Sequence, residues 1–94
     1  MLDFPELIRE DLADALARLD LGLSLSMPLS RSMPSIGKSV HELRLKEKSG
    51  NYRVVYATVV KGQVWVLLGF KKTTQKTPDR ILDLAKKRLK EISK

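Results

Sequence analysis

The 94-residue chain has no cysteine and a single histidine, His41. Disulfides, thiolate metal sites and cysteine nucleophiles are therefore excluded, and zinc has almost no ligand to bind. Aromatic residues are few, at 5% of the chain, which argues against an RNA surface built from stacking rings. We expect a protein without metal or other cofactor.

Long hydrophobic runs are also missing. The longest, residues 64–69, is far shorter than a bilayer-spanning segment. Asp3, Glu6, Glu10 and Asp11 interrupt the N-terminal region, so no secretory signal is expected there. These observations predict a cytoplasmic protein without membrane association, and the length predicts one domain over residues 1–94.

Charge is unevenly distributed along the chain, whose formal net charge is +7. Residues 1–30 contain six acidic and two basic side chains, whereas residues 31–94 contain sixteen basic and five acidic ones. A basic excess confined to two thirds of a small chain favours a polyanionic partner such as nucleic acid, an acidic protein or an anionic membrane. A solvated surface that keeps the protein soluble is the alternative.

The hydrophobic pattern predicts an α+β fold. Helical spacing predicts an N-terminal helix over residues 1–21. Residues 22–39, rich in Ser, Met, Pro and Gly, are expected to form a loop with room for a short helix near its start. A period of two then predicts a three-stranded antiparallel meander over residues 40–71. Thr77 and Pro78 begin a predicted C-terminal helix over residues 77–93.

Within the meander, the strands around residues 53–60 and 63–70 are apolar on both faces, and we expect both to be central. Trp65 and Phe70 are expected in the core. His41 shares a face with Leu43 and Leu45 and is expected to be a half-buried structural residue.

Three segments, in this order, carry a family resemblance: Glu42-Leu43-Arg44, then SGNYRVVY over residues 49–56, then GFKKTTQKTP over residues 69–78. Their order and spacing closely resemble the HigB-type branch of the RelE/ParE toxin superfamily from about residue 40 to residue 90, and more loosely from Phe4. Relatives usually have an additional strand before the first helix. The resemblance therefore predicts a RelE-like sheet that lacks this strand, or a truncated start.

The resemblance implies the toxin of a type II toxin–antitoxin pair. Relatives in this branch typically cut mRNA in the ribosomal A site without a metal, by attack of the ribose 2′-hydroxyl on the adjacent phosphate. The implied partners are the ribosome, mRNA and a cognate antitoxin, often of the helix-turn-helix type. Operator DNA would be bound only through the antitoxin complex.

Such cleavage requires a base, an acid and positive charge beside the phosphorane. Lys, Arg and Tyr must supply these functions here, and a lysine acts as a base only where neighbouring cations lower its pKa. The candidate catalytic residues are Arg53, Lys71, Lys72 and Lys46. The candidate substrate-binding residues are Arg44, Lys76, Tyr56, Thr73 and Gln75.

Each candidate has a structural alternative. Arg53 enters an apolar strand, where it meets either a phosphate or an internal carboxylate, Glu42 or Glu47. Arg44 and Lys46 also fit an ordinary polar face, and Tyr56 fits the core. The alternative for Thr73, Gln75 and Lys76 is a plain polar loop. Lys71 and Lys72 alternate across the strand, so one is expected to reach the cleft and the other solvent.

Two other functions remain open from the sequence. A ParE-like protein of the same fold would inhibit DNA gyrase and have no ribonuclease site. A degenerate toxin would retain only its affinity for antitoxin or RNA.

Overall fold

The computed structural model describes residues 4–22, 25, 29–58, 63–73 and 77–92. Two helices and four strands follow one another within these ranges. They are α1 (Glu6–Asp20), β1 (Ser30–Ser32), β2 (Val40–Glu47), β3 (Gly50–Ala57), β4 (Trp65–Lys72) and α2 (Asp79–Ile92).

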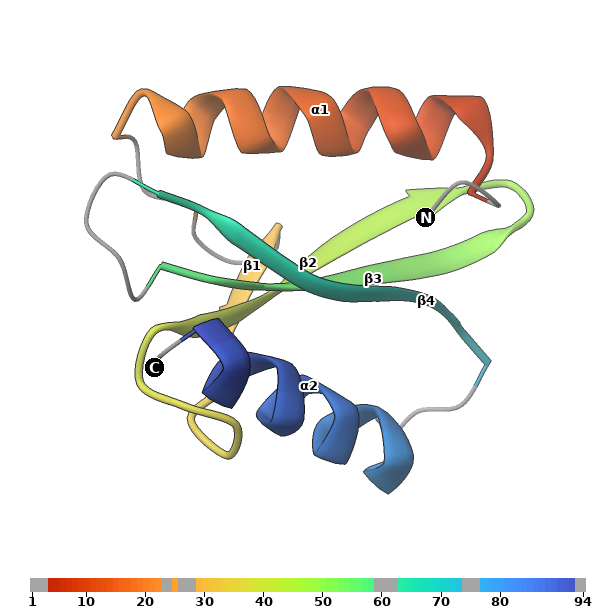
Figure 1. Ribbon diagram of the computed structural model, residues 1–94. Helices are drawn as coiled ribbons and strands as arrows, with labels where there is room; N and C mark the ends of the chain where they lie inside the picture. Colours follow the sequence, from red (N-terminus) through yellow and green to blue (C-terminus); the bar gives the residue numbers. More distant parts are fainter. Residues whose placement is uncertain (1–3, 23–24, 26–28, 59–62, 74–76, 93–94) are drawn as a thin grey trace.

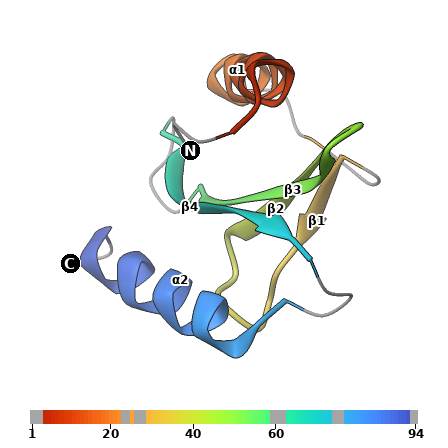
Figure 2. The same ribbon diagram turned by 90° about the vertical axis from the view of Figure 1, so that its right-hand side faces the viewer.

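The strands form one antiparallel sheet in the order β1-β2-β3-β4, so each strand pairs with its neighbour in sequence. Helix α1 covers one face of the sheet and α2 covers the other, which gives three layers (Figures 1 and 2). This arrangement confirms the predicted α+β class and is compatible with a RelE-like fold.

The face toward α1 holds the first hydrophobic core. Ile8 and Leu12, one helical turn apart, are both buried and lie on the same side of α1. They pack with apolar residues that alternate along β2 and β3: Leu43, Leu45, Tyr52, Val54 and Tyr56. The alternation sends the intervening residues of both strands to the opposite face.

The face toward α2 holds the second core. Ala85 is fully buried in the centre of α2 and is surrounded by the partly buried Ile81, Leu82, Leu89 and Ile92. Their partners on the sheet side are Ile36, Val40, Val55, Ala57, Leu67 and Leu68. This core occupies one end of the face, and the other end carries polar side chains.

A β-bulge interrupts the pairing of β3 with β4. Val55 pairs with Leu68 and Tyr56 with Val66, so Leu67 has no partner opposite it. A bulged residue leaves backbone groups outside the ladder. Arg88 of α2 donates to the Leu67 carbonyl and thereby ties the helix to the sheet.

The sheet has four strands among the described residues, so the prediction of three was wrong. The additional strand is β1, which falls inside the segment predicted to be a loop, and it follows α1 instead of preceding it. Ser30–Ser32 pairs with residues 41–43 of β2. A three-residue polar segment has no hydrophobic period, so only its tertiary partner reveals the strand.

Strand β3 is central as expected, but β4 is an edge strand. This edge strand has apolar residues on both sides because α1 covers one face of the sheet and α2 covers the other. Trp65, at the start of β4, is 41% exposed, and its indole Nε1 donates to Gln63 Oε1 at 3.2 Å. The expectation that Trp65 belongs to the core was wrong, whereas Phe70 is partly buried in the second core.

The helices are slightly shorter than predicted. Helix α1 begins after Pro5, and α2 begins after Pro78, whose carbonyl accepts from the amides of Ile81 and Leu82. Neither helix has the length and hydropathy of a membrane crossing. The short helix predicted near residue 22 lies largely outside the described residues.

Candidate functional site

The sheet register brings basic residues from three strands onto one face. Cross-strand partners share a face in an antiparallel sheet. Arg44 pairs with Arg53, and in the next row Lys46 pairs with Asn51, which in turn pairs with Lys72. The four basic residues, here called the basic cluster (Arg44, Lys46, Arg53 and Lys72), occupy the end of the α2-facing side beyond the second core.

Arg53 is the buried member of the basic cluster and is 8% exposed. Its Nε lies 3.6 Å from Glu42 Oε1, and its Nη1 donates to the carbonyl of Tyr52 at 3.2 Å. The predicted alternative of an internal ion pair is therefore confirmed with Glu42 as the carboxylate. These two contacts fix the orientation of the guanidinium.

Burial is the main influence on the pKa of Arg53, and the attraction of Glu42 outweighs the repulsion from Arg44. Burial lowers the pKa of Arg53, Glu42 opposes that shift, and the neighbouring Arg44 lowers the pKa further. A guanidinium stays protonated under all ordinary conditions. Arg44 and Arg53 are directly opposite one another, an arrangement that is destabilising for like charges and that a bound anion would relieve.

The two adjacent lysines at the end of β4 point to opposite faces, as expected. Lys72 lies in the row of Lys46 and belongs to the basic cluster. Lys71 pairs with Tyr52 on the α1 side, and its Nζ lies 5.9 Å from the centre of the Tyr52 ring. The register thus selects Lys72 as the lysine on the same face of the sheet as Arg53.

Tyr56 lies on the α1 side and is separated from the basic cluster by the sheet. It is 2% exposed, and its hydroxyl shares a 2.7 Å hydrogen bond with Ser30 Oγ. Burial raises the pKa of Tyr56, and the Ser30 hydrogen bond partly opposes that rise. This position corresponds to the core alternative predicted for Tyr56.

His41 is half-buried on the same side, as predicted, and its ring stacks on that of Tyr56 with centroids 5.2 Å apart. Burial lowers the pKa of His41. At the far end of the hairpin, Glu47 accepts a hydrogen bond from the Ser49 amide at 2.6 Å. The Ser49 side chain and then this amide lower the pKa of the Glu47 carboxyl. Neither group faces the basic cluster.

The remaining three candidates, Thr73, Gln75 and Lys76, follow β4 in the sequence. Thr73 is exposed directly after Lys72. Gln75 and Lys76 lie outside the described residues. Among the described residues, no three His, Asp or Glu side chains gather where they could hold a metal ion.

A groove of about 470 Å³ adjoins the basic cluster. It lies between the segment that follows β1 and the beginning of α2. Arg31, Glu42 and Lys72 line it together with Met33, Pro34 and Leu82. Arg31 is not among the site residues predicted from the sequence, because nothing in the sequence indicates that β1 lies beside β2. Glu42 was predicted only as a partner for Arg53.

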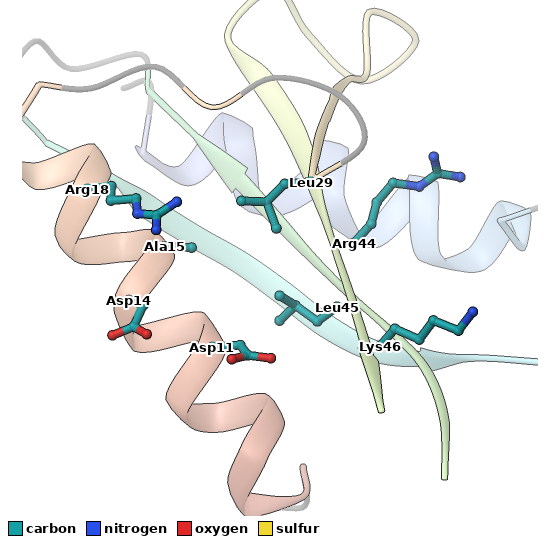
Figure 3. Close-up of a pocket in the computed structure, with 8 residues that line it drawn as sticks. All are labelled: Asp11, Asp14, Ala15, Arg18, Leu29, Arg44, Leu45 and Lys46. Carbon is teal, nitrogen blue, oxygen red and sulfur yellow. The ribbon is translucent and has the colours of Figure 1, made fainter. Parts of the chain in front are cut away.

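A second hollow, of about 220 Å³, lies between α1 and β2. Asp11 and Asp14 of α1 line it, while Arg44 and Lys46 extend away from the helix (Figure 3). Arg18 lines the helix side of the hollow as well, but the two carboxylates outnumber it there and disfavour a phosphate against α1. The basic cluster and the adjoining groove are therefore the candidate site.

Taken together, the fold and site define a small helix–sheet–helix protein with a face that can bind an anion. The chain belongs to the family described as phage derived protein Gp49-like (DUF891), whose model matches residues 1–90. This is a RelE-like, toxin-related family. The chain has no significant match among curated proteins or among solved structures.

Proposed function

We propose that this protein is the HigB-like toxin of a type II toxin–antitoxin pair, and that it inhibits translation by cutting mRNA in the ribosomal A site. The observation that carries the proposal is the juxtaposition of Arg53, Arg44 and Lys72 on one face of the sheet. Three cations on neighbouring strands match the charge of an RNA backbone. Membership of a toxin-related family supports the same function.

The proposed reaction needs no metal. The ribose 2′-oxygen attacks the adjacent phosphorus, its proton passes to a base, and the bond to the 5′-oxygen breaks as an acid protonates that oxygen. The products are a 2′,3′-cyclic phosphate and a 5′-hydroxyl. Charge accumulates on the phosphorane oxygens, where a fixed guanidinium is most effective. We assign this electrostatic role to Arg53 because its orientation is already held.

The lysines and Arg44 have more exposed side chains than Arg53. We assign Arg44 to phosphate binding, and Lys72 and Lys46 to proton transfer. Lys71 lies on the other face and serves as the matched control. The proposed partners are the ribosome, mRNA and a cognate antitoxin, in the cytoplasm, with operator DNA bound only through the antitoxin complex.

A second candidate function is supported by the Arg53–Glu42 ion pair. A guanidinium whose charge is already partly neutralised is less available to a phosphorane. A non-catalytic module that binds RNA or an antitoxin would also fit this geometry.

Expression in a bacterial host tests these functions. The protein is induced with and without the product of the adjacent gene, and primer extension on an abundant mRNA maps new 5′ ends. We expect growth arrest with new ends inside translated regions, both lost in Lys72→Ala and retained in Lys71→Ala. Circular dichroism confirms that each variant is folded.

The other outcomes identify the alternatives. Arrest without new mRNA ends would contradict the ribonuclease function and favour a gyrase inhibitor, which a gyrase-dependent DNA cleavage assay would detect. Absence of arrest with a folded protein would favour the non-catalytic module.

A further inference from the structure

The groove beside the basic cluster contains a buried acceptor without a donor. Glu42 lines the groove and is only 2% exposed. One of its oxygens, Oε1, faces Arg53, whereas Oε2 accepts no hydrogen bond from any described residue. A buried carboxylate oxygen without a donor is unfavourable. A ligand in the groove could supply that donor by taking the place of the atoms that now cover the carboxylate.

The charges around Glu42 restrict which donor fits. Arg31 and Lys72 line the same groove, and Arg53 lies directly beside the carboxylate. These cations repel a free ammonium group or metal ion. The donor should therefore be a neutral N–H or O–H group on a molecule whose overall charge is negative.

Of the other residues that line the groove, three are apolar and three, Ser32, Ser35 and Thr77, carry hydroxyl groups. Met33 and Pro34 come from the segment after β1, and Leu82 comes from α2. Such side chains can contact the flat faces of a planar ring, and a volume of about 470 Å³ lies within the range of small-molecule sites. The groove thus combines apolar side chains, cations, hydroxyl groups and one carboxylate, Glu42.

We propose that this groove binds one RNA nucleotide whose base carries an exocyclic amino group, with the amino group donating to Glu42 Oε2 and the phosphate meeting Arg31 and Lys72. The inference rests on the proposed function for its choice of RNA as the ligand. A carboxylate accepts from the N4 amino group of cytosine, whereas uracil presents an acceptor, O4, at that position. The N3–H donor of uracil lies one ring position away, so a groove that holds position 4 of the base toward Glu42 selects against uracil.

Direct titration of the full chain with mononucleotides tests the proposal. CMP and UMP have the same ring size and charge, and backbone amide shifts in NMR spectra report where each binds. We expect CMP to bind about tenfold more tightly, because a hydrogen bond to a charged group is lost with UMP. The shifts should centre on Glu42 and residues 31–35. CMP dimethylated on N4, which has no donor, should bind like UMP.

Variants separate base recognition from phosphate binding. In Glu42→Gln the ratio of the affinity for CMP to the affinity for UMP should fall to about one, because an amide can both donate and accept. Lys72→Ala should weaken both nucleotides equally, whereas Lys71→Ala, on the other face, should change neither. If Glu42→Gln does not fold, the comparison of CMP with its dimethylated form on the natural protein decides.

Equal affinity of the natural protein for CMP and UMP would overturn the proposal, as would shifts confined to another surface or no binding of either nucleotide. These results are independent of RNA cleavage. Selectivity for CMP without mRNA cleavage in cells would contradict the proposed function and leave the groove as a nucleotide site. Cleavage of mRNA in cells without selectivity for CMP would support the proposed function and overturn the nucleotide site in the groove.

Discussion

Arg53 Nε lies 3.6 Å from Glu42 Oε1 on the α2-facing side of the sheet. The two residues belong to neighbouring strands and lie diagonally across from one another. Arg44, directly opposite Arg53, leaves this buried pair with an excess of positive charge. The pair therefore has a structural role in the sheet and also orients the central cation of the candidate site.

We expect Arg53→Ala to destabilise the protein by about 3–5 kcal/mol, because it leaves the Glu42 carboxylate buried without its ion partner. The double variant Glu42→Leu with Arg53→Met removes both charges and should restore most of this loss. Urea unfolding measures both free energies. Lys48→Ala, in the exposed turn after β2, should change stability by less than about 0.5 kcal/mol. A double variant as unstable as Arg53→Ala would show that the pair contributes more than charge compensation.

RNA binding should distinguish the two adjacent lysines of β4. If Lys72 contacts a phosphate, Lys72→Ala should reduce the slope of log K against log salt by about 0.7 for single-stranded RNA. Lys71→Ala should leave the slope unchanged, because Lys71 lies over Tyr52 on the opposite face. Filter binding of a short RNA at several salt concentrations measures the slopes. Equal effects of the two substitutions would contradict the assigned face.

Tyr56→Phe should destabilise the protein by about 1–2 kcal/mol, because it leaves the Ser30 hydroxyl buried without its partner. Since Ser30 lies in β1 and Tyr56 in β3, amide exchange in β1 should accelerate most. The double variant Ser30→Ala with Tyr56→Phe should be destabilised by less than the sum of the two single variants. Additive effects in this double-mutant cycle would show that the hydrogen bond does not stabilise the fold.

The free energy of unfolding should decrease as the pH is lowered through a window set by His41. Burial lowers the pKa of His41 below its ordinary 6.5, so the unfolded chain takes up the proton more readily than the folded one. The contribution is complete above about pH 6.5 and is lost as pH falls from there toward the lower pKa of the folded state. Urea unfolding between pH 7.5 and about pH 5.5 should show a flatter pH dependence in His41→Gln. Identical slopes for both proteins would contradict this assignment.

Local sequence features determined the two helices and the three longer strands. Two patterns show this: the helical spacing of Ile8 and Leu12, and the alternation around Leu43. Both can be recognised from residues that are close together in the sequence. The same alternation predicted correctly that Arg44 and Lys46 share a face and that Lys71 and Lys72 do not. These elements and faces follow from chain geometry, because each is defined by a period of 3.6 or 2 residues.

The tertiary structure alone decided which elements meet. The polar strand around Arg31 exists because β2 offers it a pairing partner, and no period in residues 30–32 could predict that. The choice of Glu42 over Glu47 as the partner of Arg53, and of Lys72 over Lys71 as the lysine beside it, depends on the register between strands. Register is fixed by hydrophobic packing against both helices, so the sequence by itself determined the faces, and the packing of distant segments determined the site.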